Sequence, residues 1–98
     1  MPLRIDPEKN EVRALKQVAD WHGKRVLEIG CGDGRLTRRL ARLGANVQAI
    51  DPDAALIRKA RQHLPNRLAS RFRFHVGTAG LLEYPKGSFD VVVFSWVL

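Results

Sequence analysis

The 98-residue sequence has a single cysteine, Cys31, and no long apolar run. One cysteine cannot form a disulfide within the chain, so nothing indicates an oxidising compartment. No apolar stretch reaches the roughly eighteen residues of a membrane-spanning helix, and the first residues lack the apolar core of a signal peptide. These absences argue against a disulfide-stabilised or helical membrane protein. They predict one small cytoplasmic domain.

Acidic residues are also scarce in the middle of the chain. Between Arg35 and Arg73 there are ten lysines or arginines, opposed only by Asp51 and Asp53, and the whole chain has a net charge of +7. A basic helix face is predicted by the helical spacing of Arg35, Arg38, Arg39 and Arg42. Such a face is either solvated or a footprint for RNA or another anion. No stacking aromatic is interleaved with these arginines, which favours the solvated face.

Helix-like and strand-like segments alternate along the sequence. The apolar periodicity predicts helices over 7–20, 34–43 and 53–64, and strands over 25–29, 46–50, 72–76 and 89–95. The third of these strands alternates apolar with polar residues, which suits a sheet edge, whereas the fourth is nearly continuous and suits an interior strand covered on both faces. The alternation of strands with helices predicts a parallel sheet with right-handed crossovers.

Glycines at every second position follow the first predicted strand, at Gly30, Gly32 and Gly34. Glycine has no Cβ, so such a loop can turn tightly and lie directly against a ligand. Asp51 closes the second strand about twenty residues later. In a βαβ unit that spacing places a carboxylate beside the loop, where it can accept the hydroxyls of a ribose. The sequence therefore predicts a site for an adenosine-containing ligand.

Four ordered elements carry a family resemblance. They are the acidic glycine loop Glu28–Gly34, the strand-ending Asp51, the segment Gly77-Thr78-Ala79, and a proline-containing loop leading into 88–95. In order and spacing, residues 24–98 resemble the N-terminal half of a class I S-adenosylmethionine-dependent methyltransferase. The resemblance implies an α/β, Rossmann-like parallel sheet of order 3-2-1-4, flanked by helices. We expect residues 1–98 to be one domain, truncated after strand four and incomplete at its C-terminus.

The resemblance also implies S-adenosyl-L-methionine as the cofactor of a methyl transfer. The cofactor-binding residues it implies are Glu28, Gly30, Cys31, Gly32, Gly34, Asp51, Pro52, Thr78, Ala79, Phe94 and Ser95. Among them, the glycines would pack against the methionine and ribose portions, Glu28 would lie near the ammonium, and Asp51 would bind the ribose. Pro52, Thr78 and Ala79 would meet the adenine, with Thr78 where an aspartate is common. Phe94 and Ser95 would face the methyl group.

Several individual residues keep a structural alternative. Glu28 is either a cofactor contact or a partner for a nearby backbone group, and Cys31 suits a small filler of the loop rather than a nucleophile. Asp33 and Asp53 are expected to cap the helices that follow them. Asp90 is expected to lead into the fourth strand. The sequence indicates no metal site and no identifiable catalytic residue.

Other functions remain open at this stage. A nicotinamide or flavin oxidoreductase also pairs a glycine loop with a ribose-binding acid, but its fingerprint has a third glycine where this chain has Arg35. A non-catalytic cofactor-binding or interaction fragment is the third class. Its apolar stretch Val91–Leu98 would leave a free strand edge, so a homodimer through strand four is a further expectation. For a methyltransferase, the sequence favours a small-molecule acceptor over RNA.

Overall fold

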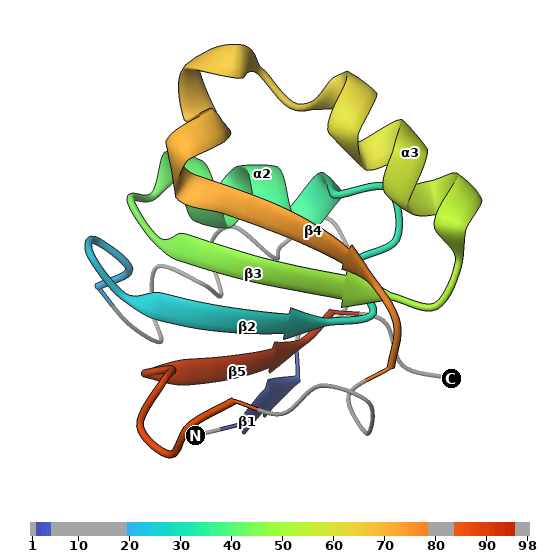
Figure 1. The fold of residues 1–98 in the computed structure, drawn as a ribbon. Helices are drawn as coiled ribbons and strands as arrows, with labels where there is room; N and C mark the ends of the chain where they lie inside the picture. Colours follow the sequence, from blue (N-terminus) through green and yellow to red (C-terminus); the bar gives the residue numbers. More distant parts are fainter. Residues whose placement is uncertain (1, 5–19, 79–83, 96–98) are drawn as a thin grey trace.

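Parallel strands form one sheet in the computed structural model, which describes residues 2–4, 20–78 and 84–95. The strands of this described part are β1 (Pro2–Arg4), β2 (Arg25–Ile29), β3 (Asn46–Asp51), β4 (Phe72–Val76) and β5 (Val91–Phe94). Their order is β1-β5-β2-β3-β4 (Figure 1). The predicted order 3-2-1-4 is confirmed by the succession β4-β3-β2-β5, and β4 lies at the sheet edge as its alternating sequence predicts. The helix expected over 7–20 falls almost entirely outside the described residues.

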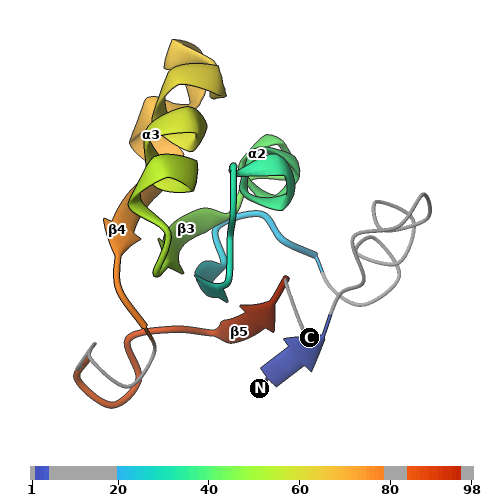
Figure 2. The ribbon, with the colours of Figure 1, turned by 90° about the vertical axis from the view of Figure 1, so that its right-hand side faces the viewer.

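Two helices, α2 (Arg35–Arg42) and α3 (Ala54–His63), cover the same face of the sheet (Figure 2). The 3-10 helix η1 (Asn66–Arg71) connects α3 to β4. Between sheet and helices lies the apolar core, in which Val26, Leu40 and Ile57 are completely buried. Burial of these side chains supplies the main stabilisation of the fold. None of the helices in the described part has both the length and the apolar character needed to cross a bilayer.

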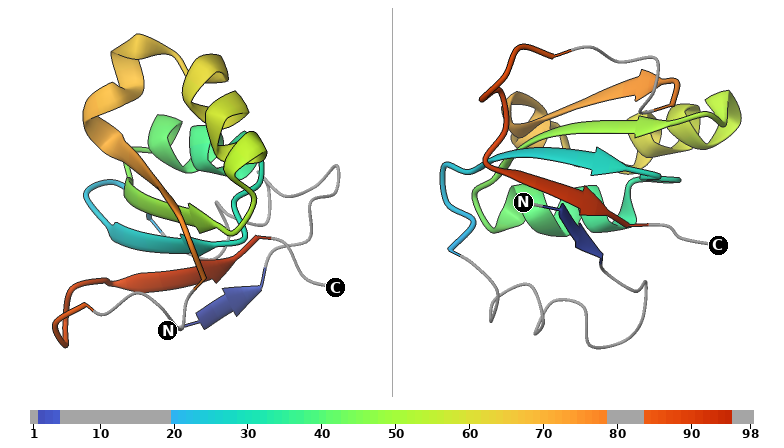
Figure 3. Two further views of the ribbon diagram at one scale, coloured as in Figure 1. Left: turned by 45° about the vertical axis from the view of Figure 1, so that its right-hand side comes forward. Right: turned by 90° about the horizontal axis from the view of Figure 1, so that it is seen from below.

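The short strand β1 was not anticipated from the sequence. It pairs in parallel with β5 over Pro2↔Val92 to Arg4↔Phe94, and the right-hand view of Figure 3 shows the two strands side by side. The strand edge expected to be free is therefore occupied along three residues. A homodimer formed through β5, the predicted fourth strand, would have to displace β1. The homodimer stays a prediction.

The strand β5 is also less covered than its sequence predicts. Val93 is fully buried, but Val91, Val92 and Phe94 keep part of their surface exposed. The reason is that α2 and α3 both lie on one face, so alternate side chains of β5 point away from them. The predicted interior position is confirmed, since β5 lies between β1 and β2, but the strand is shorter than predicted and only Val93 is fully buried.

The two helix starts differ from each other. Asp53 caps α3 as predicted, because its carboxylate accepts hydrogen bonds from the backbone N–H groups of Ala55 and Leu56, at 2.9 and 3.2 Å. The expected cap of α2 is wrong: the N-cap is Gly34, and it has no side-chain capping bond. Gly34 has φ +85°, a left-handed backbone that glycine adopts without strain.

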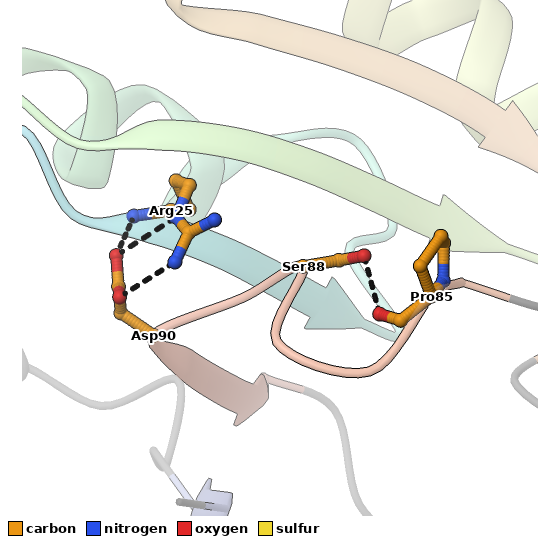
Figure 4. Close-up of polar contacts among 4 residues, drawn as sticks. All are labelled: Arg25, Pro85, Ser88 and Asp90. Carbon is orange, nitrogen blue, oxygen red and sulfur yellow. Dashed lines mark hydrogen bonds and ion pairs between the residues drawn. The ribbon is translucent and has the colours of Figure 1, made fainter.

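At the amino end of the sheet, hydrogen bonds and an ion pair join β2 to the segment before β5. The carboxylate of Asp90 accepts from the Arg25 backbone N–H at 2.8 Å and from its guanidinium at 3.1 Å (Figure 4). These hydrogen bonds lower the pKa of Asp90 to about 2. Asp90 therefore leads, as expected, into β5, which is the fourth strand predicted from the sequence. It fixes the start of this strand against β2.

Candidate functional site

The carboxyl ends of β2 and β3 are joined by the glycine loop that follows β2. The backbone N–H groups of Gly30 and Cys31 both donate to the carbonyl oxygen of Ile50, at 2.9 and 3.0 Å. A turn closes the loop, with the Gly34 N–H donating to the Cys31 carbonyl at 3.0 Å. The loop thus runs across the end of β3 and leads directly into α2.

Asp51, the last residue of β3, holds this loop from the other side. One carboxylate oxygen accepts from the Gly32 N–H and the other from the Asp53 N–H, each at 2.9 Å. The Asp51 side chain is nearly buried, with 6% of its surface exposed. Each carboxylate oxygen has two acceptor sites, so each can still accept one ligand hydroxyl. The carbonyl of Asp51 receives the Gly77 N–H at 3.0 Å, which ties the segment after β4 to the same place.

These elements surround a cleft of about 910 Å³ at the carboxyl edge of the sheet. Most of the residues expected at a cofactor line it: Gly30, Cys31, Gly32, Asp51, Pro52, Thr78 and Ser95. The Ser95 hydroxyl is held by donating to the Gly30 carbonyl at 2.9 Å. Three expected residues, Glu28, Gly34 and Phe94, are not among the lining residues, and Ala79 lies outside the described residues.

Further lining residues were not singled out for this role from the sequence. They are Ile29, Asp33, Arg35, Leu36, Ile50, Leu56 and Gly77, and Asp53 lines the cleft in addition to capping α3. Most lie on the first turns of α2 and α3 or next to an expected residue. The signal that could have found them is topological, because both helix N-termini face the same sheet edge as the carboxyl ends of the strands.

Gly34 serves packing between elements. An added Cβ would lie 2.8 Å from Leu64 Cδ1, 3.1 Å from the Ala60 Cβ and 3.1 Å from Phe74 Cζ. These neighbours belong to α3, its C-cap and β4. At Gly32, by contrast, an added Cβ would meet nothing within 4 Å. Gly32 therefore leaves space open at the cleft, and Gly34 allows α2 to begin close against α3 and β4.

Glu28 is completely buried beneath the helix layer. The strand register places it in one row with Ala49, Phe74 and Val93, on the face that packs against α2. One carboxylate oxygen accepts a hydrogen bond from the Thr37 hydroxyl, and the other has no hydrogen-bond partner in the described part of the chain. Burial raises the pKa of Glu28 to about 6, and the Thr37 hydroxyl opposes that rise. The observed partner is thus a side-chain hydroxyl, where the sequence left open a backbone group or the cofactor.

Replacing Glu28 with glutamine is expected to remove a pH dependence of stability. The pKa of Glu28 rises from 4.5 to about 6 on folding. The stabilisation that results from this shift is therefore fully present below pH 4.5 and is lost as pH rises through 6. Glutamine keeps an acceptor for Thr37 but does not ionise. Relative to wild type, E28Q should therefore gain up to about 2 kcal/mol of unfolding free energy between acidic and neutral pH.

Urea unfolding at a series of pH values measures this difference. A Thr37→Val variant is the matched control, because loss of the hydroxyl that lowers the Glu28 pKa should move the transition to higher pH. An E28Q protein with the same pH profile as wild type would contradict the assignment.

The remaining reactive side chains of the described residues do not form a catalytic group. Burial raises the pKa of the Cys31 thiol, which disfavours the nucleophilic thiolate and favours the filler interpretation. His75 contacts Gln48 on β3, with 2.7 Å between Nε2 and Oε1, and does not line the cleft. Among the described residues, no cluster of metal-ligating side chains is present.

The four arginines of α2 do not share one environment. Arg42 is exposed, Arg38 and Arg39 are partly buried, and Arg35 lines the cleft. The predicted uniform basic face is therefore only partly formed, because the helix turns Arg35 toward the carboxyl edge of the sheet. Arg35 also stands at the position where the glycine motif of nicotinamide- and flavin-binding domains has its third glycine.

The sheet is parallel, a glycine loop follows its strand β2, and an acidic residue ends the neighbouring strand β3. This combination defines a Rossmann-like α/β domain. The family model described as a methyltransferase domain matches residues 26–98. The chain belongs to this methyltransferase family, as its four ordered motifs predict.

Curated relatives agree with this membership. The chain is 43% identical over 74 residues to a magnesium-protoporphyrin O-methyltransferase of Rhodobacter capsulatus, covering 76% of this chain and 32% of the relative. It is 39% identical over 92 residues to a ubiquinone biosynthesis O-methyltransferase of Nitrosococcus oceani, covering 93% and 36%. The chain thus spans about a third of the length of these relatives.

A solved structure shows the same arrangement. The RNA methyltransferase of Salinibacter ruber, crystallised with S-adenosyl-L-homocysteine, superposes with a TM-score of 0.77 at 26% identity. The match covers 92% of this chain and 60% of the other. This likeness confirms the Rossmann-like architecture predicted from the sequence.

Proposed function

We propose that the chain binds S-adenosyl-L-methionine in the cleft at the carboxyl edge of the sheet and contributes this cofactor site to a methyl transfer. The observation that carries the proposal is the Asp51 carboxylate, held beside Gly32 in a cleft of about 910 Å³. That volume lies within the range of small-molecule and cofactor sites. The open space at Gly32 fits a ligand that lies against the backbone.

The residues of the cleft divide between the parts of the cofactor. Asp51 accepts the two ribose hydroxyls, and Pro52 and Thr78 contact the adenine, with Leu56 as a further apolar wall. The Gly30–Gly32 backbone and Ser95 adjoin the methionine portion. When bound, the cofactor supplies a methyl group already activated by its sulfonium, so the protein has to align the acceptor. This requirement suits a cleft whose described residues include no histidine.

The acceptor we favour is a small molecule that receives the methyl group on an oxygen atom, because relatives that match most of this chain are named O-methyltransferases. RNA is the second candidate, supported by the likeness to an RNA methyltransferase and by the exposed Arg42 on α2. The family match and Arg35 in the cleft weigh against an oxidoreductase. A cytoplasmic location remains a prediction.

Calorimetric titration with S-adenosylhomocysteine, with NADH in parallel, tests the proposal. We expect micromolar affinity for S-adenosylhomocysteine and no heat signal with NADH. Binding of NADH alone would overturn the methyltransferase interpretation. A folded chain that binds neither ligand would contradict a complete cofactor site in these 98 residues, and would favour the interaction-fragment alternative.

A further inference from the structure

The structure has a second hollow, at the opposite end of the sheet from the cofactor cleft. It measures about 230 Å³ and includes the first residues of β2, β3 and β4, namely Arg25, Asn46 and Phe72. We propose that this hollow binds a phosphate group. The proposal is separate from the cofactor site, because none of the residues lining one hollow lines the other.

Three arginines line the hollow, Arg25, Arg71 and Arg73, and no acidic side chain is among the lining residues. Asp90, beside the hollow, binds the guanidinium of Arg25 and so offsets that charge (Figure 4). Arg71 and Arg73 have no acidic partner in any ion pair of the described residues. Their net charge of two matches a phosphate, and the guanidinium fork presents paired donors to its oxygens.

Two of the donor side chains, those of Arg71 and Gln48, are held in place by contacts within the protein. Arg71 Nη1 donates to the Gly44 carbonyl at 3.1 Å, which holds this half-buried guanidinium against the start of β3. The Gln48 side-chain oxygen faces His75 at 2.7 Å, so its amide nitrogen keeps its donors for another partner. Arg73 lies beside Gln48 in the strand register. Donors held in this way lose less conformational freedom when an anion binds than unrestrained side chains do.

The size of the hollow limits the ligand. A volume of about 230 Å³ is below the usual range for drug-sized or cofactor ligands. It accommodates a phosphate with part of an attached group, and Phe72 and Phe89 are apolar residues among its lining. A small phosphorylated molecule and the backbone of a nucleic acid present the same phosphate chemistry. The test must therefore distinguish these two sources.

Titration of the nitrogen-15-labelled chain with inorganic phosphate, followed by NMR, is the direct experiment. We expect shifts of the side-chain amide signals of Asn46 and Gln48 and of the Nε signals of Arg71 and Arg73. Replacing the exposed Arg73 with glutamine should weaken phosphate binding about tenfold. The Arg73 side chain makes no hydrogen bond or ion pair with another described residue, so R73Q should unfold at about the wild-type temperature.

Arg58→Gln is the matched control, since Arg58 is exposed on α3, lines neither hollow, and its replacement changes the net charge equally. R58Q should bind phosphate within about twofold of wild type. Equal weakening by R73Q and R58Q, or no shifts at these four residues, would overturn the proposal. If a single-stranded RNA binds more tightly than inorganic phosphate and R73Q weakens its binding to the same degree, the phosphate belongs to a nucleic-acid backbone. If RNA binds no more tightly than phosphate, the ligand is a small phosphorylated molecule.

Discussion

Replacing Asp51 with alanine is expected to weaken S-adenosylhomocysteine binding by about 100-fold or more, because a carboxylate that accepts two ribose hydroxyls makes charge-assisted hydrogen bonds of about 1.5–3 kcal/mol each. The same substitution leaves the Gly32 and Asp53 N–H groups without their 2.9 Å acceptor. Both effects act on binding, since the loop that receives the ligand loses its anchor to β3. Calorimetric titration of the purified variant measures the change.

The matched control for this experiment is Asp33→Ala. Asp33 is an exposed carboxylate that lines the same cleft and accepts from the nearby Arg35 N–H at 3.3 Å. Its removal changes the charge of the cleft as much as D51A does, but we expect a loss of affinity below about threefold. An Asp51→Asn variant keeps the side-chain size but has a single acceptor oxygen, so it can bond only one of the Gly32 and Asp53 N–H groups and should also bind more weakly than wild type. Wild-type affinity in D51A would contradict the ribose-binding role.

Gly34→Ala is expected to destabilise the protein by about 2–5 kcal/mol. A left-handed backbone costs an alanine about 1–2 kcal/mol, and Gly34 has φ +85°. The new Cβ would also overlap Leu64 at 2.8 Å and press on Ala60 and Phe74, and overpacking of this kind adds about 1–3 kcal/mol. The free energy of unfolding in urea, compared with wild type, measures the loss.

The neighbouring Gly32→Ala separates conformation from packing. Gly32 has φ +57°, so alanine pays the same backbone cost, but its Cβ meets nothing within 4 Å. We expect G32A to lose only about 1–2 kcal/mol of stability. Its cofactor affinity should fall more strongly, because the methyl group fills space in the cleft. If G34A were no less stable than G32A, the close packing of α2 against α3 and β4 would be disproved.

The elements around the cofactor cleft could be predicted because their signals are local. The strand 25–29 and the alternating glycines after it are contiguous in sequence, and Asp51 follows at the distance that a βαβ unit requires. The Asp53 cap is equally local, since it contacts residues two and three positions later. The local pattern therefore predicted that Asp51 and Gly32 lie together, and the family resemblance supplied the order of the four strands.

The sequence did not indicate which distant neighbours a residue contacts. Gly34 was assigned to the ligand, yet the atoms nearest to it belong to residues 60, 64 and 74. Glu28 has the same character, because Thr37 reaches its carboxylate only after α2 packs on the sheet. The strand β1 has three residues, too few to show a period, and its pairing with β5 spans most of the chain.

The sequence by itself determined the strands, the glycine loop and the acid that ends the second strand, because periodicity and the glycine backbone act over a few residues; the strand order was implied by the family resemblance. Only the tertiary structure decided which of those residues reach the cleft and which support the core. It also decided where Arg71 and Arg73 meet the start of β2 and β3 to form a second hollow. Such assignments depend on burial and on contacts between distant segments, which exist only after the chain has packed.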